Sequence, residues 1–305
     1  MYLNKSRKKG EKGEGFIIMR DDDLVLYTDM GHLKEIQHMS KMNTKSHIRK
    51  INKDEYVLLE TGEIKEYEHI NNRSESKNSL FQTFKKLRYY INNNFYGKRN
   101  ELFITLTYKK NMKDRQKLMV DVEKFIKRLR YRFKGKTSID YLNIVEPQAR
   151  GAWHCHILMK FNELDSIYIP NEELRRVWGH GFVRVNRLND VDNIGAYLSA
   201  YLTDLELTDE TKMIAVERKA EIVEKTVGGK EKKFIKGGRL HLYPPGMKIF
   251  RKSEGIKYPE RKKMRLDKAK KCVGSAKPTH YAEKEINIDD DSIHITFYEY
   301  NLKRL

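Results

Sequence analysis

One stretch of the chain, Glu146-Pro147-Gln148-Ala149-Arg150-Gly151-Ala152-Trp153-His154-Cys155-His156-Ile157-Leu158-Met159, places two histidines one residue apart in an apolar run, after an upstream glutamate. Alternate side chains of a strand share a face, so His154 and His156 are expected on one side and Cys155 on the other. The face of Cys155 also holds Trp153, Ile157 and Met159 and is predicted to be core. A hairpin across residues 147–151 would bring the carboxylate of Glu146 close to His154.

These residues predict a metal site. Two imidazoles and one carboxylate leave open positions on an octahedral ion such as Mg²⁺ or Mn²⁺, which phosphate oxygens and water can fill. A His-x-His pair alone is more often surface or core histidine, and it is the carboxylate of Glu146 that favours His154 and His156 as ligands. A structural zinc site is disfavoured because four closed ligands are not evident.

A pair of tyrosines follows in a segment with helical spacing, residues 192–205. Tyr197 and Tyr201 stand four residues apart and so share one helix face, beside an inward stripe of Ile194, Leu198 and Leu202. A phenol has a pKa near 10 and attacks a phosphodiester poorly unless the phosphate is polarised, which a bound metal ion would do. Tyr-x-x-x-Tyr alone usually indicates core packing, so its weight comes from the histidine motif. Together the two motifs predict a DNA strand-nicking site.

The surrounding patterns alternate between strands and helices. Their order is strand, helix, strand, strand, helix, strand, helix, which predicts an α+β domain with a largely antiparallel sheet of about five strands flanked by helices. The strands are expected at 102–108, 141–145, 152–161 and 181–188, and the helices near 80–91, 114–133, 170–178 and 192–205.

Three regions are expected along the chain. Residues 1–73 form an N-terminal region of strands and turns without a chemical motif, 74–205 form the catalytic domain, and 206–305 form a basic C-terminal region with DNA contacts. Within the last region, the charged segment 206–232 is expected to be helical or loosely packed. Residues 251–271 are expected to be a surface or tail, and 293–300 an edge strand.

Composition bounds the partners and the compartment. The 305 residues carry a formal net charge of +19, which favours a polyanion, although a basic chain can also simply be soluble. The two cysteines, Cys155 and Cys272, suggest no disulfide framework, in keeping with a reducing compartment. No run of apolar residues is long enough for a membrane helix, so a cytoplasmic protein without a membrane partner is expected.

Taken together, three motifs resemble the HUH endonuclease superfamily, and specifically the two-tyrosine initiators of rolling-circle replication in small phages and plasmids. They are Phe103-Ile104-Thr105-Leu106-Thr107, Trp153-His154-Cys155-His156, and Tyr197-Leu198-Ser199-Ala200-Tyr201. The resemblance covers about a third of the chain. The family often has a lysine just before the second tyrosine, where this chain has Ala200.

The resemblance implies an activity. One tyrosine would attack the origin strand and keep a 5′-phosphotyrosine link, the released 3′-hydroxyl would prime synthesis, and the second tyrosine would take part in termination. His154, His156 and Glu146 would be the metal ligands. The implied partners are single-stranded origin DNA and a host helicase and polymerase, because the chain has no helicase domain.

Two alternatives stay open at this point. The first is a mobilisation or transposition nuclease with the same chemistry, although in conjugative relaxases the tyrosine precedes the histidines. The second is a non-catalytic DNA-binding regulator. Any of the three would bind the DNA backbone through basic side chains, for which the sequence offers Arg128, Arg130, Arg132, Lys262, Lys263 and Arg265.

Overall fold

The computed structural model describes residues 19–304 except 42–47, 60, 68–76, 149, 189–190, 210, 218–219, 228–229, 245–246 and 289–290. The chain divides into two units. The larger is Asn71–Tyr258, and the smaller combines Met1–Ile70 with Pro259–Leu305. The three-region division expected from the sequence concerns the roles of the regions, and it stays a prediction.

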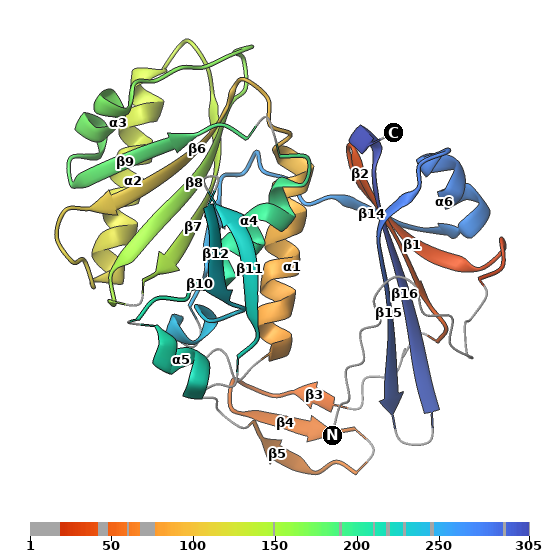
Figure 1. Ribbon diagram of the computed structural model, residues 1–305. Helices are drawn as coiled ribbons and strands as arrows, with labels where there is room; N and C mark the ends of the chain where they lie inside the picture. Colours follow the sequence, from red (N-terminus) through yellow and green to blue (C-terminus); the bar gives the residue numbers. More distant parts are fainter. Residues whose placement is uncertain are drawn as a thin grey trace. The chain divides into compact units, whose positions relative to one another are not determined.

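A five-stranded sheet forms the centre of the larger unit (Figure 1). Every neighbouring pair of its strands is antiparallel. This confirms the predicted α+β class with an antiparallel sheet. Four strands come from the expected runs, and the fifth, β13, comes from the region after residue 205. In spatial order the strands are β13 (Phe250–Lys252), β7 (Ile139–Pro147), β8 (Trp153–Phe161), β6 (Glu101–Tyr108) and β9 (Gly181–Asn186).

Helices lie on both sides of this sheet (Figure 1). The hydroxyl of Tyr108 donates to Asp121 of α2 at 2.8 Å, which places α2 on the face of β6 that bears Tyr108. On the opposite face, the ring of Phe250 lies 5.9 Å from that of Tyr90, in α1. The helices are α1 (Lys77–Asn94), α2 (Arg115–Arg132), α3 (Asn171–Trp178) and α4 (Ile194–Thr203).

The tyrosine helix α4 packs on α1. The backbone N–H of Gly195 donates to the side-chain oxygen of Asn92 at 2.7 Å, and a Cβ at position 195 would lie only 2.6 Å from that oxygen. A glycine is therefore required for this close approach. Ile194, Leu198 and Leu202 are buried in the core, as predicted.

The segment after α4 differs from the expectation of helix or loose packing. It contains one short helix, α5 (Lys212–Glu217), and a three-stranded sheet in the order β10-β12-β11. Residues such as Val223 and Phe234 have high strand propensity and lie directly opposite each other in the β11–β12 pairing, which the high charge of the segment concealed. The strands are β10 (Leu205–Glu206), β11 (Ile222–Val227) and β12 (Lys230–Ile235), followed by the 3₁₀ turn Leu240–Leu242.

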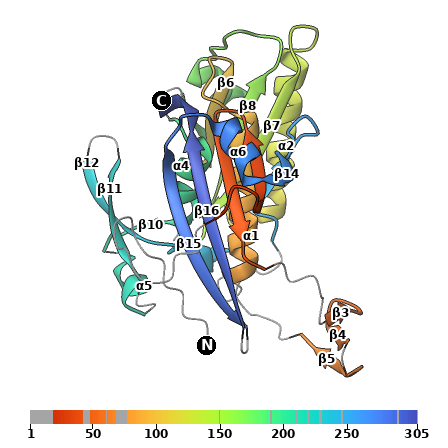
Figure 2. The ribbon, with the colours of Figure 1, turned by 90° about the vertical axis from the view of Figure 1, so that its right-hand side faces the viewer.

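The smaller unit contains a second five-stranded antiparallel sheet, in the order β14-β1-β2-β16-β15, whose long β15–β16 hairpin is seen in Figure 2. Two expectations were wrong here. The strand over 293–300 is central, between β2 and β15, because β2 supplies a second partner. Residues 251–271 are ordered, since β14 pairs with β1 and α6 packs its apolar face on a core of Val25, Tyr27 and Ile36.

The elements of the smaller unit have the following bounds: β1 (Leu24–Met30), β2 (Leu33–Met39), β14 (Glu260–Arg265), α6 (Leu266–Val273), β15 (Pro278–Ile288), β16 (Asp291–Asn301) and the 3₁₀ turn Leu302–Arg304. A separate three-stranded sheet consists of β3 (Ile48–Lys50), β4 (Glu55–Leu58) and β5 (Ile64–Glu66). Across the described part of the chain, no helix combines the length and the apolar character needed to cross a bilayer.

Candidate active site

The register of the β7–β8 hairpin assembles the predicted metal ligands. Glu146 lies directly opposite His154, and His156 lies opposite Ile144. On the other side of β8, Thr105 of β6 is the partner of His156. Side chains that face one another across antiparallel strands share a face of the sheet, so Glu146, His154, His156 and Thr105 are on one side.

The intervening residues of β8 are core. Trp153, Cys155, Ile157 and Met159 are buried and belong to the main hydrophobic cluster of the unit. The predicted separation of β8 into a core face and a histidine face is thereby confirmed. Burial without a compensating charge raises the pKa of the Cys155 thiol to about 12.

His156 is held on three sides. Its Nε2 lies against a carboxylate oxygen of Glu146, its Nδ1 lies 3.1 Å from the Thr105 hydroxyl, and its ring stacks on Phe103 at 5.6 Å. A carboxylate only accepts hydrogen bonds, so we assign the ring proton to Nε2 and let the Thr105 hydroxyl donate to Nδ1. Burial lowers the pKa of His156 to about 4, and the imidazole is neutral near pH 7.

His154 is partly buried and less fully bonded. The side-chain amide of Gln148 lies 3.2 Å from its Nδ1, while its Nε2 is buried and has no hydrogen-bond partner among the described residues. Burial, followed by the nearby charges of His156 and Arg150, lowers the pKa of His154 to about 4. A neutral imidazole with an unpartnered buried nitrogen is a suitable donor for a metal ion.

Glu146 is bound to an arginine that the sequence analysis missed. Arg239 pairs with the carboxylate oxygen that does not face His156. The same guanidinium donates to the backbone carbonyl of Asp204, just after α4, at 3.1 Å and 3.3 Å. The two charged partners are 93 residues apart in the chain, so no local pattern could have revealed the pair.

The donor set fits a divalent ion in its chemistry, with two neutral imidazoles and one carboxylate. In the described part of the chain, however, no three His, Cys, Asp or Glu side chains are disposed to hold a metal ion. The reason is visible in the contacts, because the two oxygens of Glu146 are engaged by His156 and Arg239. An ion would have to enter between groups that now bond to each other.

The tyrosine helix belongs to the same side of the sheet. It packs on α1, which covers the histidine face, and its C-terminal end is bonded to Arg239. Tyr197 is 51% exposed, so its phenol is accessible to a substrate. Tyr201 lies one turn later in the same helix.

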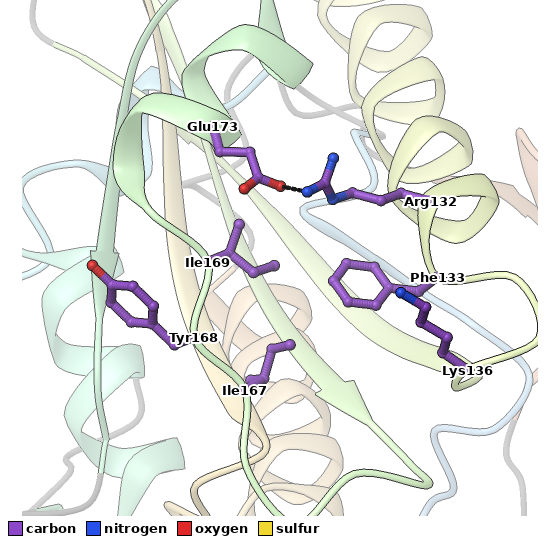
Figure 3. A pocket seen from close by; sticks show the side chains of 7 residues that line it. All are labelled: Arg132, Phe133, Lys136, Ile167, Tyr168, Ile169 and Glu173. Carbon is purple, nitrogen blue, oxygen red and sulfur yellow. Dashed lines mark ion pairs between the residues drawn. The ribbon is translucent and has the colours of Figure 1, made fainter.

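The basic residues of α2 lie on the other side of the sheet and bond within the unit. Arg128 donates to the carbonyl of Val177 at 2.9 Å, and Arg130 donates to that of Ile139 at 3.1 Å. Arg132 pairs with Glu173 at the rim of a pocket of about 410 Å³, which Figure 3 shows. None of the residues that line this pocket belongs to the histidine site. The remaining DNA-binding candidates, Lys262, Lys263 and Arg265, lie on β14 of the smaller unit.

Strand β9, at the edge of the sheet, adds two residues that the sequence analysis missed. Arg184 pairs with Thr105 and Phe182 with Thr107, so both are on the face of His156. Both are exposed, Phe182 to 61%. The alternation of Phe182 and Arg184 with the valines at 183 and 185 was the signal that could have found them.

These features define an α+β domain with a histidine–glutamate cluster and a tyrosine helix on one face of an antiparallel sheet. Residues 101–206, from β6 to β10, match the family model of the replication-associated protein ORF2. The match supports a replication initiator family for this segment, and it leaves β13 and Arg239 outside. No curated protein and no solved structure matches the chain.

The two cysteines provide a test of the face assignment. We expect a maleimide reagent to label exposed Cys272 in the native protein and to leave Cys155 unmodified, because Cys155 is buried and its thiol has a raised pKa. Mass spectrometry of tryptic peptides, with a denatured sample as the control for reactivity, measures both. Rapid native labelling of Cys155 would show that the register of β8 is wrong.

Proposed function

We propose that this protein nicks one strand of DNA at a replication origin and becomes covalently attached to it, initiating rolling-circle replication of a plasmid or phage. The observation that carries the proposal is the assembly of Glu146, His154 and His156 on the sheet face that the tyrosine helix also covers. The match of residues 101–206 to a replication-associated family supports a role in replication initiation.

The reaction would exchange one phosphoester for another. The phenol oxygen of Tyr197 or Tyr201 attacks the scissile phosphorus, a bond to that oxygen forms, and the bond to the 3′ oxygen breaks. The phenol gives up its proton, and the departing 3′ oxygen gains one. The products are a 5′-phosphotyrosine and a free 3′-hydroxyl, and no nucleotide is hydrolysed.

Glu146, His154 and His156 would hold Mg²⁺ or Mn²⁺, which polarises the phosphate when bound. The protein prepares the ligands for this task by burial, which keeps both imidazoles neutral near pH 7 so that no histidine proton has to be lost to the solvent. The Thr105 hydroxyl can accept as well as donate, so it can bond to either tautomer of His156.

Single-stranded DNA would reach this face along β9. An exposed aromatic ring at Phe182 can stack on a base, and the cation of Arg184 can bind a phosphate beside it. The net charge of +19 adds a general attraction for the backbone, to which Lys262, Lys263 and Arg265 would contribute. A host helicase and polymerase would provide unwinding and synthesis.

One observation favours a second candidate, a DNA-binding regulator without nicking activity. The engagement of Glu146 by Arg239 leaves the carboxylate partly occupied by an organic cation. In a regulator that pair would be permanent, and the protein would bind DNA without forming a covalent bond.

The tyrosines give the decisive test. With single-stranded oligonucleotides tiled across the replicon that encodes the protein, and with Mn²⁺, we expect an adduct that survives denaturing electrophoresis. Tyr197→Phe and Tyr201→Phe together should lower the adduct by about 10³-fold, because no phenol remains to attack. Tyr131→Phe, an exposed tyrosine of α2, should leave it unchanged. An adduct that persists in the double variant would refute the nucleophile assignment, and wild-type binding without any adduct would establish the regulator.

A second test concerns the ion. Calorimetric titration with Mn²⁺ alone should show one site in the wild type and an affinity at least about tenfold lower in His154→Ala. His180→Ala is the matched control, since His180 lies beside Asp121 on the α2 side. Thermal unfolding verifies that each variant is folded. Equal Mn²⁺ affinity in the wild type and His154→Ala would exclude His154 as a ligand.

A third test concerns the DNA surface. Phe182→Ala should weaken binding of a single-stranded oligonucleotide by about 1–3 kcal/mol, and Arg184→Ala should reduce the salt dependence of binding by about one phosphate contact. Fluorescence anisotropy over a range of salt concentrations measures both effects. Tyr131→Ala removes another exposed ring, from the opposite side of the sheet, and should have little effect. If that variant weakens binding more than Phe182→Ala does, the DNA lies on the other face.

A further inference from the structure

We infer that Arg239 is a positioning residue of the candidate site, which orients the carboxylate of Glu146 and fixes it against the end of the tyrosine helix. The inference deepens the proposed function and rests on it for its consequence in nicking. Its geometric part, that Arg239 holds these two elements together, can be tested without any substrate.

The contacts of Arg239 reach three elements. Its guanidinium pairs with Glu146 and donates to the carbonyl of Pro147, at the end of β7, at 3.4 Å. Two other guanidinium nitrogens donate to the carbonyl of Asp204. Its own backbone N–H donates to the carbonyl of Thr203, the last residue of α4, at 3.0 Å. One side chain thus bonds the end of a strand to the end of a helix.

The position is suited to a cation. The last carbonyl groups of a helix have no partners within the helix and carry partial negative charge, which a guanidinium can satisfy. Arg239 is only 12% exposed, and Glu146 only 5%. A charge pair so sheltered from water is weakly screened and geometrically strict, and the planar fork of arginine suits several acceptors at once.

The neighbouring residues reinforce this arrangement. The backbone N–H of Gly237 donates to a carboxylate oxygen of Asp204 at 2.8 Å, and the hydroxyl of Tyr243 donates to the carbonyl of Val145 at 3.0 Å. The segment on either side of Arg239 is therefore bonded both to the end of α4 and to β7. Such bonding fixes the arginine itself, which a positioning role requires.

The orientation of Glu146 follows from its two partners. Arg239 takes one carboxylate oxygen, so the other is directed at the imidazole of His156. A partner that bonds to a ligand beyond the metal fixes that ligand's orientation, and its loss typically lowers metal affinity about 10–100-fold. Positioning by Arg239 therefore predicts weaker Mn²⁺ binding when the arginine is removed. Competition between Arg239 and the ion would predict the opposite.

The experiment compares the wild type with Arg239→Ala, Arg239→Lys and Arg187→Ala. Arg187 is the matched control because its guanidinium also joins two backbone carbonyls, those of Arg99 and Ile167, at 2.8 Å and 2.7 Å. Arg239→Lys keeps the charge beside Glu146 but lacks the fork that reaches Asp204. It also covers the case in which Arg239→Ala, which strands a buried carboxylate, does not fold.

Hydrogen exchange is the first measurement. Amide exchange in the last turn of α4 and at Gly237 should become about tenfold faster in both Arg239 variants and stay unchanged in Arg187→Ala. Mn²⁺ affinity should fall about 10–100-fold in both Arg239 variants. The single-turnover rate of adduct formation should fall similarly, with the oligonucleotide affinity unchanged.

Three results would overturn the inference. They are unchanged exchange in α4, tighter Mn²⁺ binding without the arginine, and full rescue of exchange and adduct formation by Arg239→Lys, which would show that charge alone is sufficient. A wild type that forms no adduct but shows the expected exchange pattern would refute the nicking function and leave the positioning intact.

Discussion

The register between β7 and β8 is the constraint on which the site depends. Because side chains alternate along a strand, a slip by one residue would turn both histidines of β8 into the α2 side of the core and bring Cys155 to the site. Pairing of Glu146 with His154, together with burial of Trp153 and Ile157 on the far face, excludes that slip. The hydrophobic side of β8 therefore holds the chemical side in place.

The chemical side carries an electrostatic cost that the rest of the unit offsets. A carboxylate as buried as Glu146 is unfavourable unless it is paired and hydrogen-bonded. Its imidazole partner is neutral, so the compensating charge comes from Arg239. That arginine and strand β13, which pairs with β7, both lie outside the segment matched by the replication-associated family. The matched segment alone would have an incomplete sheet and an uncompensated carboxylate, so the residues that follow α4 are structural parts of the same domain.

The sequence predicted what depends on local pattern. The alternation in 153–159 separated core from site, and the helical stripe of Ile194, Leu198 and Leu202 placed the tyrosines on the remaining face. What it missed depends on partners distant in the chain. Whether the strand over 293–300 is central or at an edge is decided by β2, and Phe250–Lys252 becomes a strand only because β7 offers a free edge. The pair of Arg239 with Glu146 belongs to the same class, since a single arginine among many basic residues has no distinguishing local signal.

The tyrosine helix is fixed at both ends. Its first turn is bonded to α1 through Asn92, and its last carbonyls are bonded to Arg239. Between these two attachments an apolar stripe is buried and Tyr197 is half exposed. A reaction that joins a phenol to a phosphate gains from holding the two in a near-attack arrangement, and a helix anchored at each end loses little entropy when the substrate arrives. The usual family lysine before the second tyrosine is Ala200 in this chain. Rigidity supplied by Asn92 and Arg239 is a property of the fold that does not depend on that lysine, and so the helix can present the phenol of Tyr197 in the lysine's absence.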